Sequence, residues 1–214
     1  VIILTSSTPG TFSAGADIAE LETLSADRVR QESNRTAIRN AQRALARTEK
    51  PTIAQIGGAC MGGGCGLALH CDMRFAAETA RFGITPAKLG IVYPLNDTKQ
   101  LMDLVGPAHT KSMLFTGRVM GAAEALSIGL VDEIHDAGEL AEKTVAYANQ
   151  IAAVSQFSVR HIKKIIRRVL DGQTDDDAWS AEIFNKAQEG EDAAEGVRAF
   201  LEKRPAAFTW TGDD

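Results

Sequence analysis

The sequence contains few aromatic residues and few cysteines, no long apolar run, and no excess of positive charge. Phe, Trp and Tyr make up 6% of the 214 residues, and three cysteines, an odd number, do not make a disulfide framework. A reducing cytoplasm is therefore the expected compartment. The chain lacks the run of about 18 apolar residues that a membrane-spanning helix needs. Its net charge of −5 argues against broad binding to nucleic acid or anionic membranes.

The chain begins without methionine, on the apolar run Val1–Leu4, which predicts a buried strand. A signal peptide would need a charged start and a longer apolar region, and neither is present. We therefore expect the sequence to begin partway through a longer protein.

Strand and helix signals alternate through the first two-thirds of the chain and then give way to helix alone. Residues 6–15 read as a loop, and residues 18–48 as a helix with Ile38, Ala41 and Leu45 on its apolar stripe. This order predicts an α/β core over residues 1–136 and a helical region over residues 137–214.

Glycine is well represented, and its distribution is uneven. Of the 19 glycines, six lie between a predicted strand and a predicted helix: Gly57, Gly58, Gly62, Gly63, Gly64 and Gly66. Backbone N–H groups at a helix start can bind a phosphate or stabilise an oxyanion. The segment lacks the Gly-Lys-Ser/Thr of NTPase phosphate loops, and the dinucleotide-binding glycine pattern fits only loosely. Tight helix–sheet packing is the alternative explanation.

A second loop of this kind is Phe12–Ile18 (FSAGADI), which also follows a strand and precedes a helix. Asp17 alone would be an ordinary N-cap. Together, the two loops could present two N–H groups to one carbonyl oxygen.

These residues resemble a known family. Phe12–Ile18 and Pro51–Asp72 (PTIAQIGGACMGGGCGLALHCD) look like the two signature blocks of the crotonase, or enoyl-CoA hydratase/isomerase, superfamily. The resemblance implies an α/β fold, a spiral of ββα units with a C-terminal helical trimerisation region. It also implies acyl-CoA thioester substrates, no cofactor beyond the CoA of the substrate, and a homotrimer or hexamer.

The resemblance further implies a set of site residues. The oxyanion donors would be the backbone N–H groups of Ala16 and Gly63. Substrate-binding positions would be Ala14, Asp17, Ile18 and Gly62, with Phe200 and Lys203 reaching CoA from a neighbouring subunit. For Phe200 and Lys203, helix packing and a solvated lysine remain the alternatives.

The sequence departs from the family pattern where hydratases carry two glutamates, because Gly66 and Pro86 occupy those positions. Neither residue can transfer a proton. Thr85 and Tyr93 instead resemble the methylmalonyl-CoA decarboxylase-like branch, although that branch carries a histidine at position 16 and a glutamate at position 66. Loss of CO2 itself generates an enolate, so decarboxylation needs no strong base. A protein that binds acyl-CoA with little or no hydratase activity is the alternative.

Other candidate residues have simpler explanations. Asp97, near a predicted helix start, is either a substitute acid or, more simply, an N-cap. Cys65 at a helix start would favour a thiolate nucleophile, yet no histidine is paired with it. We predict no metal site, because the spacing of its candidate ligands is not that of zinc knuckles: Cys60, Cys65, His70 and Cys71.

Residues 160–168 form a basic amphipathic helix, whose apolar stripe we expect to be buried: Ile162, Ile165, Ile166 and Val169. An RNA-binding role is conceivable for the charged face, but a solvated helix is the simpler interpretation. We therefore predict no nucleic-acid partner and no membrane partner.

Overall fold

The structure is a computed structural model, and it describes residues 1–20 and 27–212. The chain forms short strands: β1 (Ile2–Leu4), β2 (Thr11–Ser13), β3 (Thr52–Ile56), β4 (Ala59–Met61), β5 (Met73–Ala77), β6 (Arg81–Gly83), β7 (Val119–Gly121) and β8 (Glu133–His135). The helices are α2 (Arg28–Arg47), α3 (Gly63–Leu69), the 3₁₀ helix η1 (Pro86–Leu89), α4 (Leu95–Thr116), α5 (Ala122–Ser127), α6 (Leu140–Ala152), α7 (Gln156–Leu170), α8 (Ala178–Glu189) and α9 (Glu191–Glu202).

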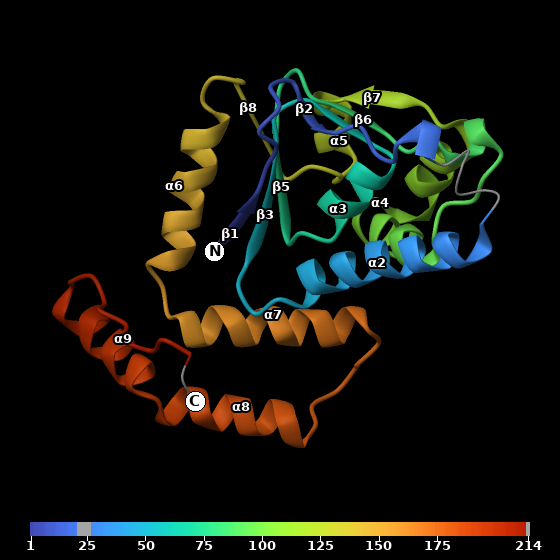
Figure 1. Ribbon diagram of the computed structural model, residues 1–214. Helices are drawn as coiled ribbons and strands as arrows, with labels where there is room; N and C mark the ends of the chain where they lie inside the picture. The colour runs from blue at the N-terminus through green and yellow to red at the C-terminus, as the bar shows by residue number, and fades with distance from the viewer. Residues whose placement is uncertain (21–26, 213–214) are drawn as a thin grey trace. The chain divides into compact units, whose positions relative to one another are not determined.

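Successive strands enter two different sheets (Figure 1). One sheet has the order β1-β3-β5-β8, and the other has the order β2-β4-β6-β7. All pairings are parallel except that of β6 with β7. The chain places one strand in each sheet and then forms a helix, and it repeats this order through β3-β4-α3 and β5-β6-α4. This winding is the spiral of ββα units that the resemblance predicts.

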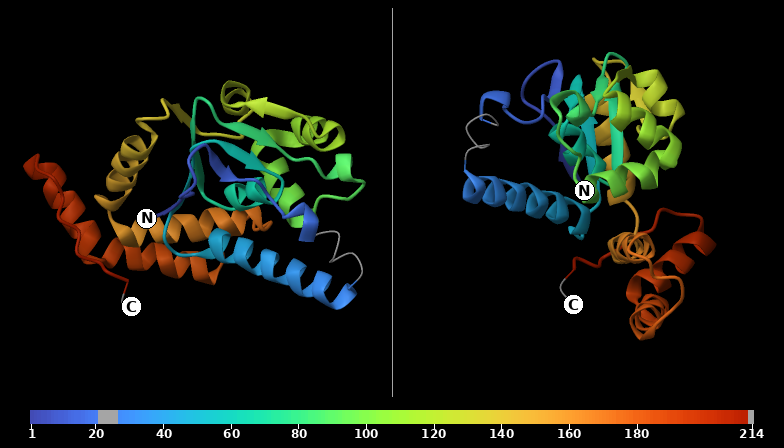
Figure 2. Two further views of the ribbon diagram at one scale, coloured as in Figure 1. Left: turned by 45° about the horizontal axis from the view of Figure 1, so that its top comes forward. Right: turned by 90° about the vertical axis from the view of Figure 1, so that its right-hand side faces the viewer.

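The core lies on the strands of these sheets, and the sequence explains why. Strands β3 (TIAQI) and β5 (MRFAA) are buried along nearly their whole length, as expected for parallel strands covered on both faces. Ile53, Phe75 and Phe82 are among the largest side chains that are almost completely buried. Each such side chain stabilises the fold by about 1.5–3 kcal/mol. Figure 2 shows the strands of both sheets from two further directions.

Strand β2 pairs with β4 through an irregular register. Thr11 lies opposite Ala59 and Ser13 lies opposite Cys60, so β2 has one residue more than its partner over this stretch. A bulge of this kind bends the strand and changes the direction in which the chain leaves it.

Three strands differ from the predictions, and the predicted helix 18–48 is not one continuous helix. Strand β2 lies inside the predicted loop 6–15, β4 inside the glycine-rich segment, and β7 in a segment where no strand was expected. Each has only three residues, too few for a recognisable alternation. Of the predicted helix 18–48, residues 18–20 are helical and α2 begins after the N-cap Asp27, while residues 21–26 lie outside the described residues.

The chain divides into two compact units, which we describe separately. The α/β unit contains residues 2–48 and 52–144, and the helical unit contains residues 1, 49–51 and 145–214. Within the described residues, no helix is both long enough and apolar enough to cross a membrane.

Helix α7 of the helical unit does not bury its apolar stripe in the single chain, so that expectation is wrong. All four members of the stripe are exposed: Ile162, Ile165, Ile166 and Val169. Periodicity reveals an amphipathic helix but not what covers its apolar face. On the polar face, Lys164 and Arg160 lie 2.8 and 3.8 Å from the Glu49 carboxylate, which offsets part of the positive charge.

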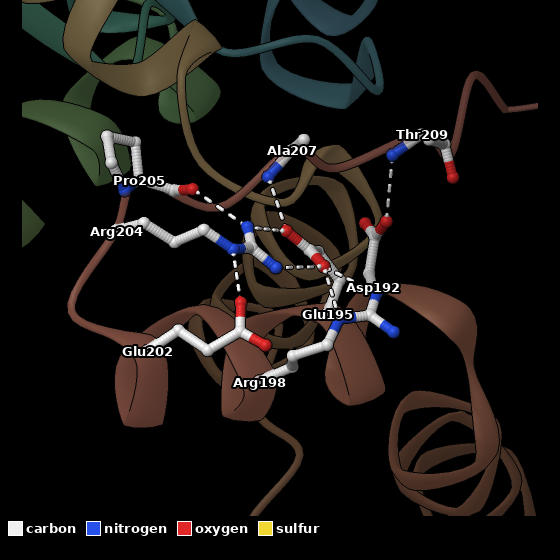
Figure 3. A network of polar contacts seen from close by, with 8 residues as sticks. All are labelled: Asp192, Glu195, Arg198, Glu202, Arg204, Pro205, Ala207 and Thr209. Atoms are coloured by element: carbon white, nitrogen blue, oxygen red, sulfur yellow. Dashed lines mark hydrogen bonds and ion pairs between the residues drawn. The ribbon is translucent and has the colours of Figure 1, made fainter.

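The C-terminal segment is held by one carboxylate of α9 (Figure 3). Glu195 accepts hydrogen bonds from Arg198 at 2.6 Å, from Arg204 at 2.5 Å and from the N–H of Ala207 at 2.9 Å. The hydrogen bond with Arg204 is the largest of the influences that hold the pKa of Glu195 far below its usual range. One turn earlier, Asp192 accepts from the N–H of Thr209 at 3.1 Å.

Candidate active site

The two glycine-containing loops leave adjacent parallel strands at the same edge of one sheet. The first loop follows β2 and the second follows β4, and these two strands pair in parallel. Because the carboxyl ends of parallel strands meet at one edge, the loops are brought side by side. The bulge in β2 then sets the direction of the first loop.

Two glycines allow these loops to approach closely. A Cβ on Gly64 would lie 2.5 Å from the Cβ of Ser13, which is too close for any other residue without a shift. Gly15 has a φ of +93°, and a Cβ there would lie 2.9 Å from the Met61 carbonyl oxygen and 3.4 Å from the Gly63 nitrogen. The first loop therefore runs directly against the start of α3.

The N–H groups of Ala16 and Gly63 are available as donors. Within the described part of the chain, neither N–H donates a hydrogen bond to another group. Gly63 is the first residue of α3, where a backbone N–H has no partner inside the helix. Its predecessor Gly62 has a φ of 49° and donates to the Gly83 carbonyl at 2.8 Å.

The other predicted substrate-binding residues of the first loop are exposed. Ala14, Asp17 and Ile18 all present accessible surface. Asp17 accepts hydrogen bonds from the N–H groups of Ala19 and Glu20 at 2.9 and 3.3 Å. Asp17 is thus the N-cap of the helical turn that follows, as its position predicts.

Thr85 and Tyr93 flank η1, where the N–H of Ile91 donates to the Pro86 carbonyl at 3.1 Å. Thr85 is half-buried, and its side chain does not cap η1. The Tyr93 side chain is 9% exposed, and its hydroxyl has no hydrogen-bond partner among the described residues. Burial, followed by the nearby charge of Asp97, raises the pKa of Tyr93 well above its usual value. The hydroxyl therefore stays protonated and can donate a hydrogen bond to a ligand.

Asp97 is not an N-cap, so that interpretation is wrong. The N-cap of α4 is Pro94, and the Asp97 side chain is only 3% exposed. Its Oδ1 accepts a hydrogen bond from Asn96 at 3.0 Å and lies 3.8 Å from Nδ1 of His70. Burial raises the pKa of Asp97, against the opposing influence of His70 and of the Gln42 amide.

Gln42 and Asn96 belong to the same cluster, and the sequence analysis missed both. Asn96 Nδ2 bridges the two side chains, because it donates to Gln42 Oε1 at 2.9 Å as well as to Asp97. The signal for Gln42 was present: it lies four residues after Ile38 and three before Leu45, on the predicted apolar stripe of α2. The structure buries Gln42, whereas Ile38 is exposed.

The cysteines lie in the core. Cys60, Cys65 and Cys71 are buried and form no disulfide within the described residues, and Cys65 donates its thiol proton to the Cys60 carbonyl at 2.8 Å. In the described part of the chain, no three His, Cys, Asp or Glu side chains come together as metal ligands.

Phe200 and Lys203 belong to the helical unit, so their assignment to CoA binding stays a prediction. Phe200 is 83% exposed near the end of α9. Lys203 is the C-cap of α9, with a left-handed φ of 54° that turns the chain toward the segment held by Glu195.

The fold and these loops agree with the comparison to known families. The model of the enoyl-CoA hydratase/isomerase family matches residues 1–211. The chain belongs to this family. The crotonase-superfamily resemblance of its two signature blocks is thereby confirmed.

Members of the enoyl-CoA hydratase/isomerase family resemble the chain over nearly its whole length. It is 38% identical to the crotonyl-CoA hydratase of Syntrophomonas wolfei over 97% of this chain and 80% of that protein. It is 35% identical to the short-chain-enoyl-CoA hydratase of Clostridium acetobutylicum, over 95% and 77% of the two chains. A family structure from Hyphomonas neptunium superposes with a TM-score of 0.94 at 46% identity, covering 98% of this chain and 80% of that one.

Proposed function

We propose that this protein is an acyl-CoA lyase or isomerase that stabilises a thioester enolate between the N–H groups of Ala16 and Gly63. The observation that carries the proposal is the meeting of two loops with free N–H groups at one sheet edge. The hydratase names of the relatives support a short acyl-CoA as the substrate. CoA enters as part of this substrate, and no further cofactor is required.

The two N–H groups would act on the charge that develops in the reaction. When an α-proton or an α-carboxylate leaves the substrate, the electron pair that remains moves onto the thioester oxygen. Two donors fixed by the backbone stabilise that oxygen, and the loss of one such donor typically costs about 3–4 kcal/mol of barrier. The backbone of Ala14, Asp17 and Ile18 would lie along the CoA moiety, with Gly62 beside the oxyanion.

The reaction itself is either hydration or isomerisation of the acyl chain, or decarboxylation. The relatives named as hydratases favour hydration or isomerisation. Gly66 and Pro86, which stand where hydratases carry acids, favour decarboxylation. In a decarboxylation, the bond between the α-carbon and the carboxylate breaks, CO2 leaves, and the enolate later takes up a proton. Thr85 and Tyr93 would orient the substrate by donating hydrogen bonds.

We further propose a homotrimer or hexamer, supported by the exposed apolar face of α7. In such an assembly Phe200 and Lys203 would reach the CoA of a neighbouring subunit. A monomer, measured by light scattering at micromolar protein concentration, would contradict the proposed assembly.

The proposed activity is tested directly with the full chain. Crotonyl-CoA hydration and CO2 release from methylmalonyl-CoA should be followed side by side, and we expect turnover of at least one substrate. The absence of turnover with a wide acyl-CoA panel, together with micromolar CoA binding, would instead identify an acyl-CoA-binding protein without hydratase activity.

The oxyanion site has its own test in two glycine substitutions. Gly64→Ala would press a methyl group against Ser13 and move the two loops apart, so we expect kcat to fall by about 10²–10³-fold. Gly57→Ala is the matched control, because a Cβ at Gly57 meets no atom within 4 Å. Equal rates in the two variants would contradict the proposed oxyanion site.

A further inference from the structure

The Asp97 carboxylate is fixed on one side and open on the other. Asn96 donates to Oδ1 and holds the side chain in a single orientation. The Gln42 amide also interacts with this carboxylate and lowers its pKa, but among the described residues no hydrogen bond of ordinary geometry reaches Oδ2, although the Asp97 side chain is almost completely buried. A buried carboxylate oxygen without a donor is costly, because the lost hydration is not replaced.

The open oxygen faces a position on α3 that has no side chain. A Cβ on Gly66 would lie 3.2 Å from Asp97 Oδ2 and 2.8 Å from Gln42 Nε2. Gly66 lies three residues after Gly63, so the two share one face of α3 about one helical turn apart. Glycine at position 66 leaves the helix surface open to the Asp97 carboxylate.

Two donors without a hydrogen bond of ordinary geometry among the described residues lie near Asp97: the Gln42 amide at the Gly66 position, and the Tyr93 hydroxyl, which feels the charge of Asp97. Gln42 is 1% exposed and Tyr93 is 9% exposed, and neither Gln42 Nε2 nor the Tyr93 hydroxyl has a hydrogen-bond partner in the described part of the chain. Buried polar groups in native proteins are nearly always satisfied, so two orphaned donors beside an open carboxylate indicate that a ligand completes the set. These groups come from α2, from the segment before α4, and from α4 itself.

We propose that Asp97 is a catalytic acid/base that transfers a proton between its Oδ2 and the α-carbon of the bound thioester. This inference rests on the proposed function, in which the N–H of Gly63 is one of the two oxyanion donors. In the forward direction, the O–H bond of the protonated carboxyl breaks, the enolate electron pair forms the C–H bond, and the carboxylate is left. The reverse step removes the α-proton. Asn96 and Gln42 are positioning residues.

The surroundings of Asp97 suit this exchange of protons. Burial raises the pKa of the carboxyl, so its protonated form is accessible nearer to neutral pH than for an exposed aspartate. The titratable neighbours are His70, whose Nδ1 lies 3.8 Å from Oδ1, and Tyr93, whose pKa the charge of Asp97 helps to raise. Tyr93, whose pKa is raised, is the poorer proton donor of the two acids.

The experiment measures exchange of α-protons of a saturated thioester, butyryl-CoA, in D2O by mass spectrometry. The wild-type protein should incorporate deuterium, and Asp97→Asn should slow incorporation by about 10²–10⁴-fold. The affinity for butyryl-CoA, measured by calorimetry, should change by less than about threefold, which also shows that the variant is folded. Asp103→Asn is the matched control on α4, since its carboxylate lies 2.6 Å from Lys99, and should exchange at the wild-type rate.

Two results would overturn the assignment. Exchange by Asp97→Asn at the wild-type rate would remove Asp97 from the mechanism and leave the proposed function intact. If the wild-type protein turns over crotonyl-CoA or methylmalonyl-CoA but does not exchange α-protons of butyryl-CoA, Asp97 is likewise removed from the mechanism and the proposed function stays intact. Loss of thioester turnover in every assay would instead count against the proposed function itself.

Discussion

Asp97 and Glu195 are both largely buried carboxylates on helices, yet they have opposite surroundings. Glu195 accepts hydrogen bonds from Arg198, Arg204 and a backbone N–H, which together hold its pKa far below the usual range. Asp97 accepts one hydrogen bond of ordinary geometry among the described residues, from Asn96, and burial raises its pKa against the influence of His70 and the Gln42 amide. Both oxygens of Glu195 accept hydrogen bonds, whereas among the described residues only Oδ1 of Asp97 accepts one of ordinary geometry.

The difference separates a structural carboxylate from a chemical one. The partners of Glu195 lie on α9 and on the segment that follows it, so ionisation ties that segment to the helix. The cluster around Asp97 contains two donors without a partner in the described part of the chain, and a buried donor without a partner costs stability. Such local cost is typical of residues retained for activity.

After the Gly64 and Asp97 substitutions, the largest expected effect concerns Tyr93, near Asp97. Tyr93→Phe removes a hydroxyl that has no partner within the described residues, so the melting temperature should not fall. The kcat for the substrate that is turned over should fall about tenfold or more, because the bound substrate loses an orienting donor. Steady-state kinetics and thermal unfolding of the same preparation check both parts. An unchanged kcat would exclude a role for the hydroxyl.

Glu195 should behave in the opposite way. Glu195→Gln leaves Arg204 with Glu202 as its remaining ionised partner and weakens the acceptor of the Ala207 N–H. Hydrogen exchange of the Ala207 amide should accelerate by roughly tenfold, with kcat little changed. Glu202→Gln is the control, because Glu202 on the same helix is exposed and, among the described residues, bonds only Arg204 Nε. Equal amide exchange in the two variants would contradict the structural role of Glu195.

Glu195→Gln should also change how the free energy of unfolding depends on pH in the acid range. Because the folded-state pKa of Glu195 is depressed, its contribution is present above the unfolded value near 4.5 and is lost as the pH falls below it. Wild-type unfolding should therefore depend on pH below about 4.5 more steeply than unfolding of Glu195→Gln. A pH series of denaturant melts measures the two slopes.

The smallest expected effect is that of Asp97→Asn on the free energy of unfolding, and its sign should be opposite to that of Glu195→Gln. The folded-state pKa of Asp97 is raised, so its ionised form opposes folding once the pH exceeds its unfolded value of about 3.8. Asp97→Asn should raise the free energy of unfolding at pH 8 by about 1 kcal/mol, and the gain should disappear at pH 3. A loss of stability at pH 8 would show that Asp97 is structural like Glu195.

Much of the fold and the two loops could be predicted from the sequence. The blocks Phe12–Ile18 and Pro51–Asp72 are local, and their glycines are needed where the chain passes close to itself, as Gly64 does against Ser13. The three-residue strands β2, β4 and β7 could not be predicted, because strand pairing rather than local pattern defines them.

The Asp97 cluster and the exposed face of α7 could not be predicted either. Gln42 and Asn96 are 54 residues apart, so only tertiary packing brings their amides together. Ile166 lies on the apolar stripe of α7, but the spacing of that stripe does not tell whether another surface covers it. Local patterns identify which face of an element is apolar, and long-range packing decides its neighbours.

The extra residue in β2 has a consequence for how this protein can vary through insertion and deletion. Each residue of a strand advances the chain by about 3.3 Å, whereas a hydrogen-bond length tolerates only a few tenths of an ångström. Removing or adding one residue between Thr11 and Gly15 would therefore displace the Ala16 N–H beyond the reach of a shared acceptor. Side chains can be exchanged at Ala16 while its donor survives, so in this stretch natural selection should act more strictly on length than on composition.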